Sequence, residues 1–249
     1  MFAFHLREAP LIEGDRLTST DSFTLRHLWV ARIRPDEEFV LIHDGTRMVC
    51  MLIRLTAGEL EARVLKSHRP PLRKVQLVMA LGVLAGTKLD NTLFALTQLG
   101  VDAFVMFQGR RSTQRHGDWS SRVKRWERKI LDACEISDMV NPPEVLLADD
   151  VADLAQVASS VVGENAHRLL FYEAAGQDAE DLKEWLKSPY DGEAVLGVVG
   201  PEGGFEREEV EALIASGFKA LSLGERILEA RVAAYFIASL LSAWIGELG

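Results

Sequence analysis

The sequence predicts an α/β protein in which a parallel-sheet domain follows a smaller β-rich domain. In residues 1–70, short strand-like stretches alternate with turn signals, as in a small β-barrel or sandwich. After Pro70-Pro71, apolar strands that end at glycine alternate with helices, which is typical of a parallel sheet covered on both faces. We therefore expect domains at 1–70 and 71–249, with the boundary at the two prolines.

The elements expected in the first domain are short. Residues 22–32 have the pattern of a short amphipathic helix. Residues 38–43 are strand-like and end at an Asp-Gly pair, a favourable hairpin dipeptide, so residues 48–55 are the expected partner strand. A third strand is expected at 60–66, after an Ala-Gly pair. Together these elements predict a small antiparallel sheet.

The second domain reads as short apolar strands separated by helices. Most of the strands close at a glycine, which marks the turn into the next helix. In chain order the expected elements are a strand at 75–81, a helix at 89–99, a strand at 102–107, a helix at 120–134, strands at 168–172 and 194–199, a helix at 206–216, a strand at 220–223 and a helix at 227–245.

The net charge of −9 is unevenly distributed along the chain. Residues 144–249 hold 20 acidic against 7 basic residues, whereas the first 143 residues are slightly basic. Because phosphate binding depends on local charge, the N-terminal part remains eligible as a nucleic-acid surface.

Two further observations indicate a cytoplasmic protein with no metal site. No apolar run approaches the roughly 20 residues needed to cross a membrane, and the first ten residues lack a secretion signal. Cys50 and Cys134 lie far apart without metal-ligand spacing around them, and the histidines are scattered. We therefore expect reduced thiols, no bound metal and no membrane partner.

Three late strands run into loops that could hold a ligand, at 173–176, 200–204 and 223–226. In open α/β sheets, ligands bind beyond the carboxyl ends of the strands. The middle loop has three glycines around Pro201, which leave its backbone accessible. It has neither the Gly-Lys-Ser/Thr of a P-loop nor the spacing of the dinucleotide fingerprint. On local chemistry alone, it could equally be a tight strand-to-helix turn.

A basic stretch at 109–129 interleaves Trp119 and Trp126, whose faces could stack on unpaired bases. Alternatively, its charges solvate a helix face and Trp126 packs into the core. The glycine-flanked loop at the start of this stretch is the better place for phosphate contact. Its arginines are Arg110, Arg111 and Arg115.

The Gly-Pro-Glu-Gly-Gly-Phe run at 200–205, followed by Leu-Gly-Glu-Arg-Ile-Leu at 223–228, resembles the ribosomal RNA small-subunit methyltransferase E family of the SPOUT superfamily. The resemblance covers nearly the whole chain, including Arg26-His27-Leu28 near its start. It implies a SPOUT-type domain with a trefoil knot and a small N-terminal PUA-like β-barrel. It also implies N3 methylation of a uridine in small-subunit rRNA, with S-adenosylmethionine as cofactor, by a homodimer.

The resemblance also implies roles for individual residues. Arg226 is the expected catalytic cation, although a helix-end salt bridge is a nearly equal alternative. Glu202 could orient its loop or the ligand, or cap the helix near Glu206. The expected cofactor-binding residues are Tyr172, Glu173, Gly200, Pro201, Glu202, Gly203, Gly204, Leu223, Gly224, Ile227 and Leu228. The expected contacts to small-subunit rRNA, or to the assembling small subunit, are Arg26, His27, Arg110, Arg111, Arg115 and Arg125.

Several segments depart from the family pattern. They are the pair Phe4-His5, Ile136 and Met139, and 229–232, where the family usually has Arg-Thr-Glu-Thr. An alternative therefore stays open, namely a non-catalytic or re-targeted RNA- or ribosome-binding paralogue that keeps the fold. An enzyme acting on a small molecule is a third, less favoured reading.

The closing helix is apolar nearly all round from Val232 to Ile245. Such a helix is buried on most sides, in a core or against another subunit. We expect a homodimer through this helix.

Overall fold

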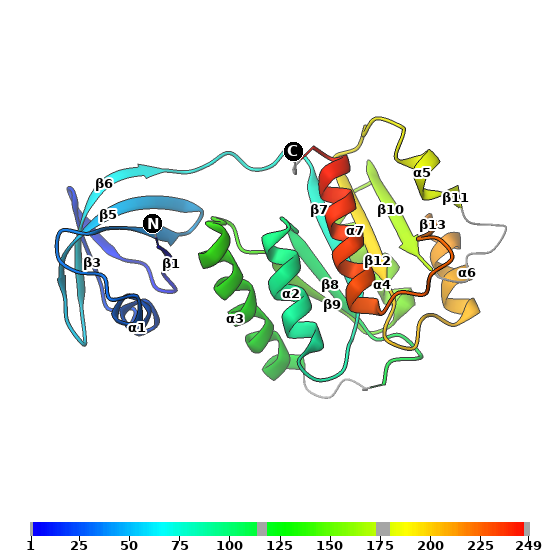
Figure 1. Cartoon of the computed structure of the whole chain (residues 1–249), viewed down its shortest axis with the longest axis horizontal. Coiled ribbons are helices and arrows are strands. Elements are labelled where there is room, and N and C mark those ends of the chain that lie inside the picture. Colours follow the sequence, from blue (N-terminus) through cyan, green and yellow to red (C-terminus); the bar gives the residue numbers. More distant parts are fainter. Residues whose placement is uncertain (1, 114–118, 173–179, 247–249) are drawn as a thin grey trace. The chain divides into compact units, whose positions relative to one another are not determined.

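The computed structural model describes residues 2–113, 119–172 and 180–246 and divides the chain into two compact units (Figure 1). The first unit comprises the residues up to Leu72 together with Leu131–Pro142. The second comprises Arg73–Ile130 and the residues from Pro143 onward. The sequence analysis had assigned Leu131–Pro142 to the second domain.

The first unit is built on a six-stranded sheet in the order β1-β4-β5-β6-β3-β2. The expected meander is present: β4, β5 and β6 pair antiparallel, while β1 adds to β4 in parallel. The short strands β1, β2 and β3 were not anticipated. The elements are β1 (Ala3–His5), β2 (Leu11–Glu13), β3 (Arg16–Ser19), α1 (Ser22–Ala31), β4 (Glu38–His43), β5 (Thr46–Leu55) and β6 (Leu60–His68).

Helix α1 begins where Asp21 caps it, because the Asp21 carboxylate accepts a hydrogen bond from the backbone N–H of Phe23 at 3.1 Å. Its inner face places Leu28 in a core with Leu17 and Phe39, all fully buried. This apolar layer between α1 and the sheet holds the first unit together.

The segment 131–142 completes the first unit through Glu135. Its carboxylate accepts hydrogen bonds from the backbone N–H of His5 at 3.2 Å and from the His27 ring at 3.1 Å. Burial raises the pKa of Glu135 and lowers that of His5, whose ring contacts the Met139 carbonyl oxygen at 2.9 Å. Two positions that depart from the family pattern, His5 and Met139, thus contact each other here.

The second unit is built on a seven-stranded sheet in the order β11-β13-β10-β12-β7-β8-β9, in which all recorded pairs are parallel. The expected α/β class with a parallel sheet is confirmed. The strands are β7 (Gln76–Gly82), β8 (Ala103–Phe107), β9 (Glu144–Ala148), β10 (Ala166–Phe171), β11 (Glu180–Asp181), β12 (Ala194–Val199) and β13 (Lys219–Ser222).

Helices cover this sheet. Side chains of α4 and α6 join one apolar cluster with β7, β8 and β12, while α7 packs on β7 and β12 beside α2 (Figure 1). None of the helices in the described ranges is both long and apolar enough to span a bilayer. The helices are α2 (Lys88–Gln98), α3 (Trp119–Ser137), α4 (Val151–Val162), α5 (Leu182–Trp185), α6 (Arg207–Ala215) and α7 (Ala230–Trp244).

Three expectations differ from this structure. The strands β9 and β11 and the helices α4 and α5 were not predicted. The final helix begins at Ala230 rather than residue 227, because residues 223–229 form a loop that lines a pocket. Trp126 is 1% exposed and packs into the core, so it is not a surface on which a base can stack.

Both cysteines should be inert while the protein is folded. Cys50 and Cys134 are free thiols, fully buried, and burial raises the pKa of each to about 12. We expect Ellman's reagent to detect no thiol in the native protein and two thiols per chain in guanidinium chloride without reductant. Rapid labelling of the native protein, or fewer than two thiols after unfolding, would contradict this picture.

Candidate functional site

A pocket of about 480 Å³ opens at the carboxyl ends of β10, β12 and β13. Its walls are Phe171 and Tyr172 at the end of β10, the loop 200–205, the segment 223–229 and the first turn of α7. This is where open α/β sheets bind ligands, and the volume is in the range of small-molecule sites. The sheet topology therefore brings the second and third of the predicted loops to one place.

The loop at 200–205 lies tightly against the neighbouring strand ends. A Cβ added at Gly82, the last residue of β7, would overlap the backbone nitrogen of Pro201. A Cβ at Gly109, just after β8, would lie 2.9 Å from the Pro201 ring. Behind the loop, the Phe205 ring stacks on that of Phe107, with centroids 6.0 Å apart. Glycine is thus needed where the proline crosses these strand ends.

The segment at 223–229 presents backbone and apolar surface to the pocket. Gly224 has φ of 98°, a conformation that favours glycine, and its N–H donates to the Ser222 hydroxyl at 3.1 Å. Arg226 and Ile227 are exposed, and both line the pocket. Glu229 then stands at the N-cap position of α7.

Sequence reasoning missed two charged residues of this pocket, Lys88 and Glu229. The Lys88 ammonium lies 2.6 Å from the Glu202 carboxylate and 3.6 Å from that of Glu229. The hydrogen bond to Glu202 raises the pKa of Lys88, and the same bond lowers the pKa of Glu202. The sequence did contain one indication that Lys88 lies at the pocket: it begins the helix that follows a strand ending at this edge of the sheet.

Every described residue predicted to bind the cofactor lines this pocket, and so does the predicted catalytic residue Arg226. Glu173 lies outside the described residues. Glu202 does not cap α6: Glu206 takes that position, and its side chain forms a capping box with Glu209. The lining residues that the predicted set did not include are Lys88, Phe171, Val199, Phe205, Glu229, Ala230 and Ala233.

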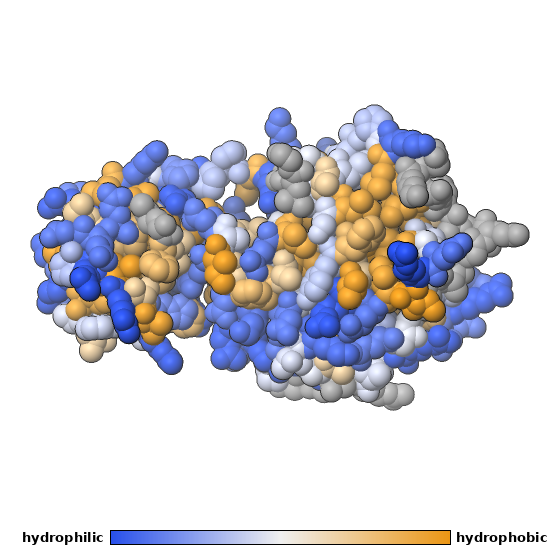
Figure 2. All heavy atoms as spheres, viewed as in Figure 1, coloured by the Kyte–Doolittle hydropathy of each residue, from blue (hydrophilic) through white to orange (hydrophobic). Residues whose placement is uncertain are grey.

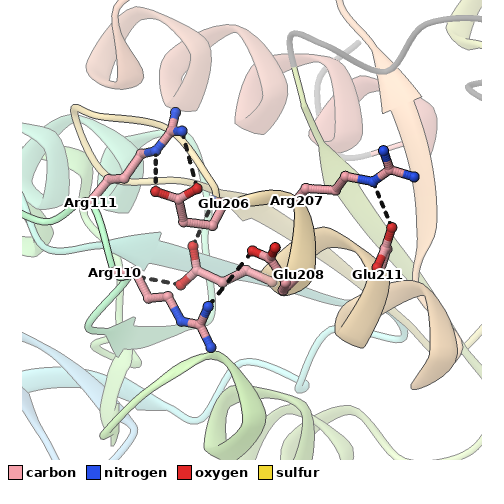
Figure 3. Close-up of polar contacts among 7 residues, drawn as sticks. Arg110, Arg111, Glu206, Arg207, Glu208 and Glu211 are labelled. Atoms are coloured by element: carbon pink, nitrogen blue, oxygen red, sulfur yellow. Dashed lines mark hydrogen bonds and ion pairs between the residues drawn. The ribbon is translucent and has the colours of Figure 1, made fainter.

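Two arginines of the basic loop contact acidic residues at the start of α6 (Figure 3). Arg111 forms a forked ion pair with Glu206, with N–O distances of 2.7 and 3.1 Å, which lowers the pKa of Glu206. The backbone N–H of Arg110 donates to Glu209 at 2.9 Å, and its guanidinium lies 3.7 Å from Glu208. These arginines attach the loop to α6. Arg115 lies outside the described residues.

The other predicted RNA contacts are dispersed. Arg125 in the second unit pairs with the buried carboxylate of Asp90 at 3.1 Å. In the first unit, Arg26 is exposed on α1, while the His27 ring packs against that of Phe23 at a tilt of 48°, with centroids 4.0 Å apart, and contacts Glu135. No described group of three or more His, Cys, Asp or Glu side chains is placed to hold a metal ion.

Comparisons with known proteins indicate an RNA methyltransferase. A family model described as an RNA methyltransferase domain matches residues 71–242. The chain is 28% identical to the ribosomal RNA small subunit methyltransferase E of Aquifex aeolicus over 87% of this chain and 90% of that protein. It is 31% identical to that of Mycobacterium tuberculosis over 82% and 78%, respectively.

A solved structure is similar over its full length. The Neisseria gonorrhoeae protein of the same name, crystallised bound to S-adenosyl methionine, superposes with a TM-score of 0.85 at 25% identity and covers 100% of both chains.

Adding one methyl group where Pro201 crosses β7 should destabilise the fold. Gly82→Ala places its Cβ against the Pro201 nitrogen, so we expect a loss of about 1–3 kcal/mol in the free energy of unfolding, measured in urea. Gly58→Ala is the matched control, because a Cβ there meets open space. Equal free energies of unfolding for the two variants would contradict this prediction and would show that the loop at 200–205 shifts to accommodate the methyl group.

Proposed function

The chain belongs to the ribosomal RNA small subunit methyltransferase E family, within the RNA methyltransferase domain family, and we propose that it methylates N3 of a uridine in small-subunit rRNA. It is an S-adenosylmethionine-dependent rRNA methyltransferase. The observation that carries the proposal is the pocket at three strand ends, walled by glycine loops and by Arg226. We place this activity in the cytoplasm, where the small subunit assembles.

The pocket fits the cofactor. Gly200, Gly203 and Gly224 expose backbone on its wall, where N–H and C=O groups can bind the polar edges of a nucleoside. Phe171, Leu223 and Leu228 supply apolar surface for a flat base. The other predicted cofactor residues, among them Tyr172 and Ile227, complete our proposed set, to which Glu173 still belongs. S-adenosylmethionine supplies the methyl group from a positively charged sulfur.

The chain's own contribution to catalysis is positioning and charge. Uracil N3 must lose its proton to a base before it can attack a methyl group, and negative charge then spreads to the two carbonyl oxygens beside N3. We propose that the Arg226 guanidinium stabilises that charge, because it is exposed at the pocket rim on the same segment that forms the wall. Holding the ring in line with the methyl group supplies much of the remaining rate.

We propose that RNA binding uses both units. Arg26 is exposed on α1 of the first unit, beside His27, and its donors are available to phosphate. The side chain of Arg110 is 67% exposed and that of Arg111 49% exposed, so both guanidinium groups lie where phosphate can approach them. Arg125 and Arg115 remain proposed contacts. The six-stranded sheet with α1 against it supports a PUA-like first unit.

The course of the chain after β13 supports the proposed trefoil knot. The segment 223–229 leaves β13 beyond β10 and reaches α7, which packs on β7 and β12. In doing so it shares a pocket wall with the loop at 200–205. A trefoil knot requires that such a connection thread through a loop, and we propose that this segment does so.

We further propose a homodimer through α7. Its inner face is buried, with Ile237 and Leu241 fully covered. Its outer face still exposes Val232 at 44% and Phe236 at 48%, and Figure 2 shows apolar residues gathered over this helix. An apolar helix face of this kind is suited to an isologous contact between two copies.

The proposed activity is tested with unmodified small-subunit rRNA. We expect saturable S-adenosylmethionine binding by calorimetry and methyl transfer that nuclease digestion and mass spectrometry locate at N3 of one uridine. Arg226→Ala should lower kcat about 10²–10³-fold while the dissociation constant for the cofactor changes little. Arg207→Ala, an exposed arginine paired with Glu211, is the control (Figure 3). Cofactor binding without transfer to any RNA would favour the non-catalytic paralogue instead.

The dimer is tested by sedimentation at micromolar concentration. We expect the wild type at twice the 27.7 kDa mass of one chain, and Phe236→Asp as a monomer, because an interface cannot bury an unpaired carboxylate. Ile214→Asp on α6 is the control, since Ile214 is also 48% exposed. A monomeric wild type would contradict the proposal.

A further inference from the structure

Three chain segments that are far apart in sequence meet at the Lys88 ammonium group. Lys88 is the first residue of α2, Glu202 belongs to the glycine loop at 200–204, and Glu229 precedes α7. The Lys88 nitrogen lies 2.6 Å from a Glu202 oxygen and 3.6 Å from a Glu229 oxygen, and all three residues line the pocket. One cation therefore joins both walls of the pocket to the start of α2.

Glu202 is the centre of a wider set of contacts. Its second oxygen accepts a hydrogen bond from the Thr113 hydroxyl at 3.2 Å. Lys88 begins the helix that follows β7 and Thr113 follows β8, so this carboxylate joins the glycine loop to the segments after both strands. Its side chain is 19% exposed and that of Lys88 46% exposed, so water partly screens the ion pair and the pair acts mainly by fixing the positions of the loops.

Glu229 is the weaker partner of Lys88, because it lies 3.6 Å from the ammonium group whereas Glu202 lies 2.6 Å from it. It lies in the 229–232 segment, which departs from the family pattern, and it also pairs with Arg231 at 3.3 Å. The local charge is balanced, because Lys88 and Arg231 face Glu202 and Glu229. The altered segment therefore brings a partner for Lys88 into the pocket wall that carries Arg226.

We propose that Lys88 is a positioning residue for the methyl donor: it ties the glycine loop, through Glu202, and the Arg226-bearing segment, through Glu229, to the start of α2. This inference rests on the proposed function of the pocket. Without the ammonium group, two carboxylates remain near each other at the rim with no cation between them, and like charges drive their loops apart. A pocket with a less defined width binds the donor less well, because binding must then order the loops.

The Lys88–Glu202 ion pair also makes donor binding depend on pH at the acid end. The Lys88 hydrogen bond lowers the pKa of Glu202 below its ordinary value of 4.5. The contribution of this pair is therefore fully present above pH 4.5 and is lost as the pH falls through the lower folded pKa. Lys88→Met lacks this pair, so the acid-dependent loss of donor affinity should be absent from that variant.

The test is a double-mutant cycle read by calorimetry with S-adenosylmethionine. We expect Lys88→Met to raise the dissociation constant about three- to tenfold, and Lys88→Arg to preserve most of the affinity. Glu202→Gln and Glu229→Gln should each weaken binding in the wild-type background but have little further effect beside Lys88→Met. The KM for the donor should rise in the same variants, whereas the KM for RNA should not. Lys124→Met, at an exposed lysine of α3 outside the pocket, is the matched control.

Three outcomes would overturn the inference. Wild-type affinity in Lys88→Met would show that the ion pairs do not position the loops. Independent, additive effects of the three substitutions would show that Lys88 contacts the donor by itself. An equal loss of affinity in Lys88→Arg would show that charge is not the active feature. Circular dichroism and urea unfolding check that each variant is folded. Failure of the wild type to bind the donor would instead refute the proposed function.

Discussion

The crossing of Pro201 over the ends of β7 and β8 is the steric constraint on which the site depends. No Cβ is accommodated at Gly82 or Gly109, so the backbone of the glycine loop lies directly on the sheet edge. Phe205 then stacks behind it on Phe107, and the capping box of Glu206 starts α6. Close packing at this point converts three separate strand-to-helix turns into one pocket of defined shape.

Ion pairs between the loops add to this packing. The pocket rim carries alternating charges from Lys88, Glu202 and Glu229, and the outer side of the same loops carries Arg111 paired with Glu206. Each pair is partly exposed, so each contributes modestly by itself. Their common effect is on geometry, because every pair joins a loop that follows one strand to a loop or helix that follows another.

The sequence predicted the glycine-lined pocket well, since glycine and proline constrain the backbone by themselves and family motifs mark their positions. The sequence did not predict side-chain contacts between residues that lie far apart in the chain. Nothing local to Glu135 indicates that it binds His5, and nothing local to Lys88 names Glu202. Ile227 and Leu228 were predicted both to bind the cofactor and to begin the last helix; they line the pocket, but the helix begins at Ala230, because apolar periodicity does not fix a helix boundary. The short run at β9 was not recognised as a strand; it lies at the edge of the sheet and is only partly buried.

The discontinuity of the first unit has a consequence for biosynthesis. Its strands are complete by His68, yet the buried Cys134 and the neighbouring Glu135, which accepts the His5 hydrogen bond, lie more than sixty residues further on. During translation, at roughly 5–20 residues per second, the six-stranded sheet emerges several seconds before the segment that completes the unit. In that interval the backbone N–H of His5 lacks its carboxylate acceptor, so the N-terminal unit is completed only after β7, α2 and β8 of the second unit have been made.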